Sequence, residues 1–169
     1  MTKLVEVKIA DARYEEDLFN LCMDLWDENG IFPVSPDKVR GFIRLATGVT
    51  PRAPTDAAPL IGVIGEPGKI EGAIALVVSQ LWYADTWHIE ELWNFVRPEY
   101  RRSTNAKSLI EFSKGVQAKL NIPLLIGILS SERTEAKERL YQRQLGDKAG
   151  VYFVYPTWSA LKAEQHAAA

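Results

Sequence analysis

The sequence is poor in the residues that make covalent cross-links and metal sites. Only one cysteine, Cys22, and two histidines occur among its 169 residues. A single cysteine excludes an internal disulfide, and these three residues lie too far apart in the sequence to offer a metal-ligand spacing, so we expect no metal. Cys22 lies in an apolar stretch with helical spacing, which favours a small buried hydrophobe over a nucleophile.

Long apolar runs and an excess of either charge are also missing. No run approaches the roughly 20 apolar residues of a membrane span, and the first residues lack the apolar stretch of a secretion signal. We therefore expect a soluble, cytoplasmic protein with no membrane partner. The 20 basic and 22 acidic residues give a net charge of −2. This balance argues against a broad nucleic-acid-binding surface, which would need an excess of positive charge.

The length and the 47% hydrophobic content favour one compact core. We expect a single domain over residues 1–161 and a frayed tail over residues 162–169. Residues 46–59 are rich in Pro, Thr, Gly and Ala and hold no apolar period. They predict a surface loop.

The rest of the chain alternates between strand and helix periodicity. The expected strands cover residues 5–9, 60–64, 70–79, 88–96, 122–129 and 151–155. The expected helices cover residues 14–27, a stretch opened by Ser35 and Pro36, residues 105–120 and residues 133–145. The strand at 122–129 is short and apolar, as is typical of a strand covered on both faces. This order predicts an α/β fold class, with a mixed sheet and helices on both of its faces.

The most informative segment is the junction at residues 94–107, where a strand feeds directly into a helix. Unpaired N–H groups at the positive end of the helix dipole make such a junction an anion site. Arg101 and Arg102 can fork onto phosphate oxygens, and Ser103 and Thr104 add hydroxyl donors. Ala106 is small enough to let a bulky group approach. An ordinary capped helix that begins with solvated arginines is the alternative.

The spacing Val96-x-Pro98-x-x-Arg101-x-x-Thr104-x-Ala106 resembles the coenzyme A pyrophosphate loop of the GNAT-type N-acetyltransferase family. The resemblance covers roughly residues 5–155 and is nearest to short members from tailed bacteriophages. It implies a GNAT-like fold with a mostly antiparallel central sheet, and acetyl-coenzyme A as the co-substrate. The residues that the resemblance assigns to cofactor binding are Phe95, Val96, Arg101, Arg102, Ser103, Thr104, Asn105, Ala106, Lys107 and Thr134. Arg102 and Thr104 stand where the family usually has glycine.

The resemblance also implies a direct attack of a neutral amine on a thioester. Tyr141, preceded by Leu140, would reprotonate the leaving thiolate, because a phenol with a pKa near 10 still carries its proton near neutral pH. A core position is the alternative for Tyr141. Strand alternation lets only one of Glu90 and Glu91 face the substrate, and we favour Glu91 as the base. His88 could serve instead, although a polar residue at the strand rim is the more frequent case. Backbone N–H groups near Phe95 would stabilise the oxyanion.

The acceptor and the partners are less constrained. A small-molecule or protein amine fits the reaction, and the acidic loop at residues 27–33 would favour a cation. A nucleic-acid-modifying acyltransferase is an alternative because of Arg97, Arg101, Arg102 and Lys107. A catalytically idle binding module is another alternative. Four aromatic residues could line a substrate wall or a homodimer surface, although core packing is expected for at least two of them: Trp82, Tyr83, Trp87 and Trp93.

Overall fold

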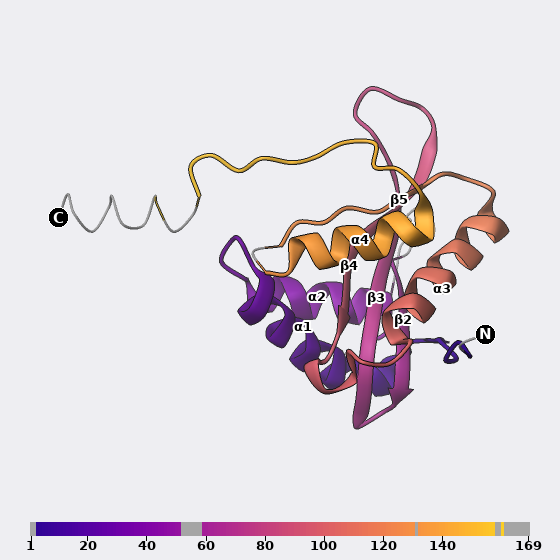
Figure 1. Cartoon of the computed structure of the whole chain (residues 1–169). Coiled ribbons are helices and arrows are strands. Elements are labelled where there is room, and N and C mark those ends of the chain that lie inside the picture. The colour runs from indigo at the N-terminus through magenta and orange to yellow at the C-terminus, as the bar shows by residue number, and fades with distance from the viewer. Residues whose placement is uncertain (1–2, 52–58, 131, 158–159, 161–169) are drawn as a thin grey trace.

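The chain folds into a single sheet with helices on both faces, as seen in a computed structural model that describes residues 3–51, 59–130, 132–157 and 160 (Figure 1). The helices are α1 (Glu15–Asn29), α2 (Pro36–Ala46), α3 (Asn105–Leu120) and α4 (Thr134–Leu145), with short 3-10 turns η1 (Ala12–Tyr14) and η2 (Pro98–Tyr100). The strands are β1 (Lys8–Ile9), β2 (Leu60–Glu66), β3 (Lys69–Gln80), β4 (Trp87–Val96) and β5 (Leu124–Leu125). The predicted tail at 162–169 and residues 52–58, half of the predicted loop at 46–59, lie outside the described residues.

The sheet has the strand order β1-β2-β3-β4-β5. Neighbours from β1 to β4 pair antiparallel, and β5 pairs parallel to β4. The predicted mixed, mostly antiparallel sheet with helices on both faces is confirmed. None of the described helices combines the length and the apolar character that a membrane crossing requires.

Two apolar clusters fix the helices to the sheet. On one face, Leu18 and Leu21 of α1 and Ile43 of α2 pack against β2 and β3. On the other face, Leu109 of α3 packs against Ile74 and its neighbours. Cys22 is buried in the first cluster, and burial raises the pKa of its thiol to about 12. The prediction of a small buried hydrophobe is confirmed, since a thiol of that pKa is unreactive near neutral pH.

Local sequence signals set several boundaries. The Ser35 hydroxyl accepts the N–H of Lys38 and Pro36 occupies the first turn of α2, as predicted. The predicted strands at 60–64 and 70–79 form a hairpin of β2 and β3, whose turn needs the positive φ of Gly65 and Gly68. The third helix begins and ends at the predicted residues, 105 and 120.

The C-terminal third departs from the predictions. Pairing at β5 covers two residues instead of residues 122–129, and alternate positions along 121–129 are exposed, so the expectation of a strand covered on both faces is wrong. Residues 151–155 form no strand: they run along the outside of the molecule and away from it (Figure 1). A strand needs a hydrogen-bonded neighbour, and neither segment finds one along its length within the described residues.

Most of the aromatic group lies outside the core. Trp82 is 95% exposed at the tip between β3 and β4, where it meets the edge of Tyr83, and Trp87 is also exposed. Only Trp93 is buried, so the expectation that at least two of the four pack in the core is wrong. His88 is buried instead of lying at the strand rim.

Candidate functional site

A β-bulge in β4 determines which face of the sheet carries Glu91. Ala75 lies opposite Trp93, but the next residue, Leu76, lies opposite Glu91, so Leu92 is an extra residue in β4. Strict alternation would place Glu91 and Trp93 on the same face of the sheet. The bulge separates them: Trp93 joins the core under α1 and α2, whereas Glu91 faces α4.

Glu91 is buried and meets Tyr141 of α4. The Tyr141 hydroxyl donates to the Glu91 carboxylate, with Oη 3.1 Å from Oε1 and 3.2 Å from Oε2. Burial raises the pKa of Glu91 to about 8, against the opposing effects of the Tyr141 hydrogen bond and the charge of Lys137. Burial and the neighbouring carboxylate hold the pKa of Tyr141 well above its usual value of 10. The structure therefore brings together the two side chains that the sequence predicts as catalytic.

A second polar cluster lies one turn earlier on α4. Lys137 Nζ donates to Asn29 Oδ1 and to Ser130 Oγ, both at 2.7 Å, and the Ser130 hydroxyl donates to the same Asn29 oxygen at 3.0 Å. Burial lowers the pKa of Lys137. Sequence reasoning missed this cluster. The spacing of Lys137 and Tyr141, four residues apart on one helix face, is the signal that could have found it.

Thr134 begins α4 and is exposed. Its hydroxyl donates to the carbonyl oxygen of Ser130 at 3.2 Å. This predicted cofactor residue thus holds the start of α4 against the preceding turn.

Beyond Glu91, the edge of β4 that faces β5 is open within the described residues. The β4–β5 ladder pairs Ile89 with Leu124 and Glu90 with Leu125, and there it ends. The backbone from Glu91 to Phe95 therefore lies beside a gap in the sheet pairing, where N–H groups can serve a ligand. This is the place predicted for oxyanion stabilisation near Phe95.

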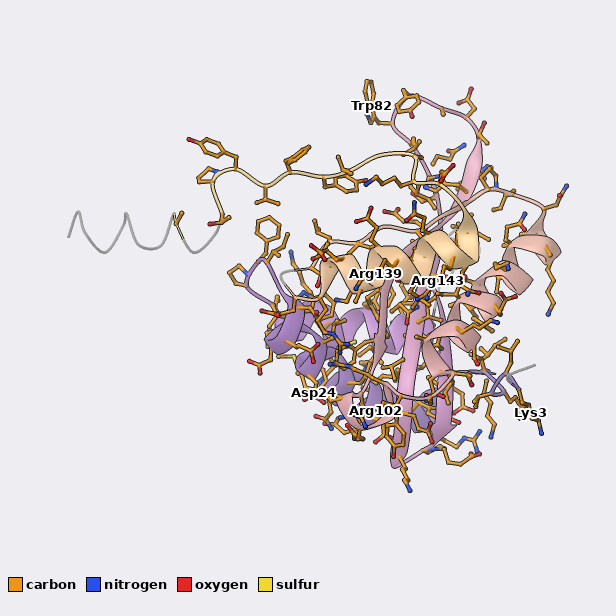
Figure 2. All side chains as sticks on the ribbon, in the orientation of Figure 1. Lys3, Asp24, Trp82, Arg102, Arg139 and Arg143 are labelled. Carbon is orange, nitrogen blue, oxygen red and sulfur yellow. The ribbon has the colours of Figure 1, made fainter. Side chains whose placement is uncertain are left out.

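The predicted pyrophosphate loop follows at the far end of β4, at the opposite end of that strand from Trp82 (Figure 2). Arg101 is already engaged there: its Nε donates to the Val96 carbonyl at 3.0 Å and its Nη2 to Glu28 at 2.6 Å. Its guanidinium also lies 5.3 Å from the centre of the Phe95 ring. Arg97 makes a similar ion pair with Asp24 at 2.6 Å, so two acidic residues of α1 hold this loop.

Several polar side chains of the loop also have partners within the protein. The Ser103 hydroxyl donates to the Tyr100 carbonyl and accepts the N–H of Asn105. The Thr104 hydroxyl donates to the Lys3 carbonyl, and the Asn105 amide donates to Glu71. These three side chains shape the turn into α3.

The groups that remain directed at solvent suit an anion. Arg102 and Lys107 are exposed at the start of α3. The N–H groups of Ala106 and Lys107 belong to the first helical turn, where no carbonyl within the helix can accept them. The buried Asn105 Oδ1 has no partner among the described residues, which marks a spot at this turn where a donor is missing. Backbone N–H groups and two cations thus fit a phosphate, while the predicted hydroxyl donors are used internally.

Solved structures of other proteins are similar to this chain over about nine tenths of its length. No family model matches the chain, and no curated protein matches its sequence. Among solved structures, AAC(6')-Iy in complex with the bisubstrate analogue CoA-S-monomethyl-acetylneamine is similar with a TM-score of 0.68 and 13% identity, over 90% of this chain and 97% of that one. The ribosomal-protein-alanine N-acetyltransferase of Brucella melitensis biovar Abortus 2308 is similar with a TM-score of 0.63 and 12% identity, over 89% and 98% of the two chains.

The chain has the GNAT acyl-CoA N-acyltransferase fold. Sequence identities of 12–13% show a shared fold, so the function has to be argued from the residues of the site. Within the GNAT fold, the Glu91–Tyr141 pair and the β4–α3 loop are joined by the last five residues of β4, about 16 Å of extended chain. The resemblance to bacteriophage members stays a prediction.

Proposed function

We propose that the protein is an enzyme of the cytoplasm that transfers an acetyl group from acetyl-coenzyme A to an amine. The observation that carries this proposal is the hydrogen bond between Tyr141 and the buried Glu91, 50 positions apart in the sequence. A phenol and a carboxylate with raised pKa values supply the acid and the base that the reaction needs. The GNAT fold supports the same reaction class by analogy.

The pair can complete a proton cycle that restores both groups. Glu91, in its ionised form, accepts the proton of the attacking amine, directly or through a water, as the N–C bond forms. Tyr141 donates its proton to the departing thiolate as the C–S bond breaks. The phenolate then recovers a proton from Glu91 across the 3.1 Å hydrogen bond, which restores both groups. The open N–H edge of β4 near Phe95 would stabilise the oxyanion.

The co-substrate would supply the activated acyl group, and the chain offers places for its phosphates. Arg102, Lys107 and the first N–H groups of α3 are directed at solvent and suit a pyrophosphate. Arg101 would join them by exchanging Glu28 for a phosphate oxygen. Phe95, Val96, Ser103, Thr104, Asn105 and Thr134 would act by positioning this loop and the start of α4.

The acceptor is proposed to be a small-molecule or protein amine. The solved relatives include aminoglycoside acetyltransferases and the ribosomal-protein-alanine N-acetyltransferase, which represent these two classes. A nucleic-acid acceptor is less supported, because Arg97 and Arg101 are neutralised by Asp24 and Glu28. An exposed run of free cations is what phosphate contacts would require.

The test is acetyl transfer from acetyl-coenzyme A to a panel of amines by Tyr141→Phe and Glu91→Gln variants. We expect kcat to fall by about 10²- to 10⁴-fold in each, the usual contribution of general acid–base catalysis. Tyr83→Phe, at an exposed hairpin tip, is the matched control and should retain full activity. The kcat of the wild type should rise with pH toward about 8 as Glu91 ionises, and this limb should vanish in Glu91→Gln.

A catalytically idle binding module is the second candidate. It is favoured by one observation: Arg101, Ser103 and Thr104 all have partners within the protein. It predicts no turnover of acetyl-coenzyme A with any amine. Acetyl transfer above background, lost in Tyr141→Phe, would exclude it.

A further inference from the structure

The C-terminal segment at residues 151–155, Val-Tyr-Phe-Val-Tyr, is unusually exposed for its composition. Tyr152, Phe153 and Tyr155 are 76%, 92% and 97% exposed, and Val151 is 61% exposed. β-Branched and aromatic residues of this kind are enriched in strands, and a contiguous apolar segment on a surface marks an interaction site. The segment makes no backbone hydrogen bond with any other described residue. It is therefore a segment of strand-like composition that has no hydrogen-bonded neighbour among the described residues.

The same chain presents a sheet edge that lacks a neighbour. β5 pairs with β4 through Leu124 and Leu125 only, and residues 126–129 continue without a backbone partner among the described residues. Their side chains alternate between half-buried and exposed, as in a strand with one covered face, and Leu129 is exposed. An open edge of this kind takes up an extended segment by main-chain hydrogen bonds.

The connection between α4 and the segment directs it away from its own body. Gly146 ends α4 with φ 97° and ψ −155°, a conformation open to glycine alone, and its N–H bonds to the Gln142 carbonyl. Two residues later, Lys148 pairs with Glu138 of α4 at 2.7 Å. The linker is thus held along α4, and residues 151–155 extend outward beyond it (Figure 1).

We propose that residues 151–155 of one copy add as a strand to the open edge at residues 126–129 of a second copy, and that the exchange is reciprocal. One chain carries both the donor strand and the acceptor edge, so a two-fold axis satisfies both at once and closes the assembly. The exchange would also order the segment that leads to Ser130, whose hydroxyl holds Asn29 and Lys137 beneath α4. The dimer would therefore support the wall of the candidate site.

The first experiment measures the mass of the full chain in solution by light scattering between about 1 and 100 μM. We expect twice the 19.0 kDa of one chain for the wild type. Phe153→Asp puts a charge on the donor strand and should raise the dissociation constant at least tenfold, shifting the protein to monomers. Leu120→Asp, at the end of α3 where the leucine is 49% exposed, is the control and should stay dimeric. Circular dichroism should show both variants folded.

A mixing experiment distinguishes exchange between copies from docking within one copy. Gly127→Pro removes an N–H from the acceptor edge at a position where an added side chain meets no atom within 4 Å. Phe153→Asp keeps an intact edge, and Gly127→Pro keeps an intact donor strand. Each should be monomeric alone, whereas their mixture should form a dimer through the one remaining exchange.

Two results would overturn the proposal: a wild type that stays monomeric at every concentration, and a Phe153→Asp variant that remains dimeric. If the wild type is monomeric, hydrogen exchange identifies the alternative: protected amides at 151–155 and 126–129 would mean that the segment docks on its own edge. None of these measurements uses acetyl transfer, so they stand apart from the proposed activity.

Discussion

The two parts of the molecule on either side of residue 120 are held together in different ways. Every buried hydrophobic side chain among the described residues lies at or before Ile110, most of them in β2 to β4 and in the helices α1 to α3. After residue 120, α4 contains no buried residue, and the segment at 151–155 is mostly exposed. The first part is a packed core, and the second lies on its surface.

The proposed site nevertheless spans both parts. Glu91 and Asn29 belong to the packed part, while Tyr141 and Lys137 come from α4. Hydrogen bonds join the two parts here instead of apolar packing. Elements with few buried apolar contacts open at low free-energy cost. The comparison thus predicts that α4 opens at a lower free-energy cost than the packed core.

The largest expected effect is the difference in unfolding free energy between a substitution in the core and one in the surface helix α4. Ile74 is completely buried between β2 and β4, so Ile74→Ala should cost about 2–5 kcal/mol of unfolding free energy. Leu145 at the end of α4 is 42% exposed, and Leu145→Ala should change stability by about 0.5 kcal/mol or less. Urea denaturation of both variants measures the difference. Equal losses would show that α4 is part of the cooperative core.

The next effect concerns Glu91, where the packed part carries a carboxyl group with a raised pKa. The folded state keeps this proton up to about pH 8, whereas the unfolded state loses it near pH 4.5. Folding therefore takes up a proton between these values, and the stability contributed by this group is full below pH 4.5 and is lost as pH rises to about 8. The slope is at most about 1.4 kcal/mol per pH unit.

Glu91→Gln removes this titration and keeps an acceptor for the Tyr141 hydroxyl. The stability of wild type relative to Glu91→Gln should fall steadily from pH 5 to 8 and level off above that range. Glu90→Gln, next to it on β4, is the control and should show no such trend. A constant difference across the range would mean that Glu91 is ionised in the folded state throughout.

The packed part is also the part that local sequence signals predict well. Ser35 and Pro36 mark the start of α2, glycines mark the β2–β3 turn, and the bounds of α3 follow from its own apolar period. Each of these signals acts within a few residues of the structure that it specifies. They apply to the described residues before 120, where side-chain burial then agrees with the local preference.

The sequence alone did not predict features that depend on residues far apart in the chain. The bulge at Leu92 arises from the register between β3 and β4, and no residue type announces it. Lys137 meets Asn29 across 108 positions, and Arg101 meets Glu28 across 73. The strand pattern at 151–155 is present in the sequence, but the segment has no hydrogen-bonded neighbour among the described residues. A family resemblance pointed to Tyr141, whereas strand alternation only limited the base to one of Glu90 and Glu91.

The smallest expected effect is on the affinity for acetyl-coenzyme A at the β4–α3 loop, which two acidic residues of α1 hold. The Glu28 carboxylate forms an ion pair with Arg101, with Oε2 2.6 Å from Nη2, and both side chains are about a quarter exposed. A phosphate that binds Arg101 must displace it, and partly exposed ion pairs contribute about 1 kcal/mol or less. Glu28→Gln should therefore tighten acetyl-coenzyme A binding by a few-fold, up to about fivefold, in calorimetry.

Asp24→Asn is the matched control, because Asp24 pairs with Arg97, outside the predicted phosphate contacts, and should leave the affinity unchanged. Weaker binding by Glu28→Gln would instead mean that the carboxylate positions Arg101 for the ligand. In that case α1 would act as a support for the phosphate loop, and the packed part would contribute more to ligand binding than the surface helix does.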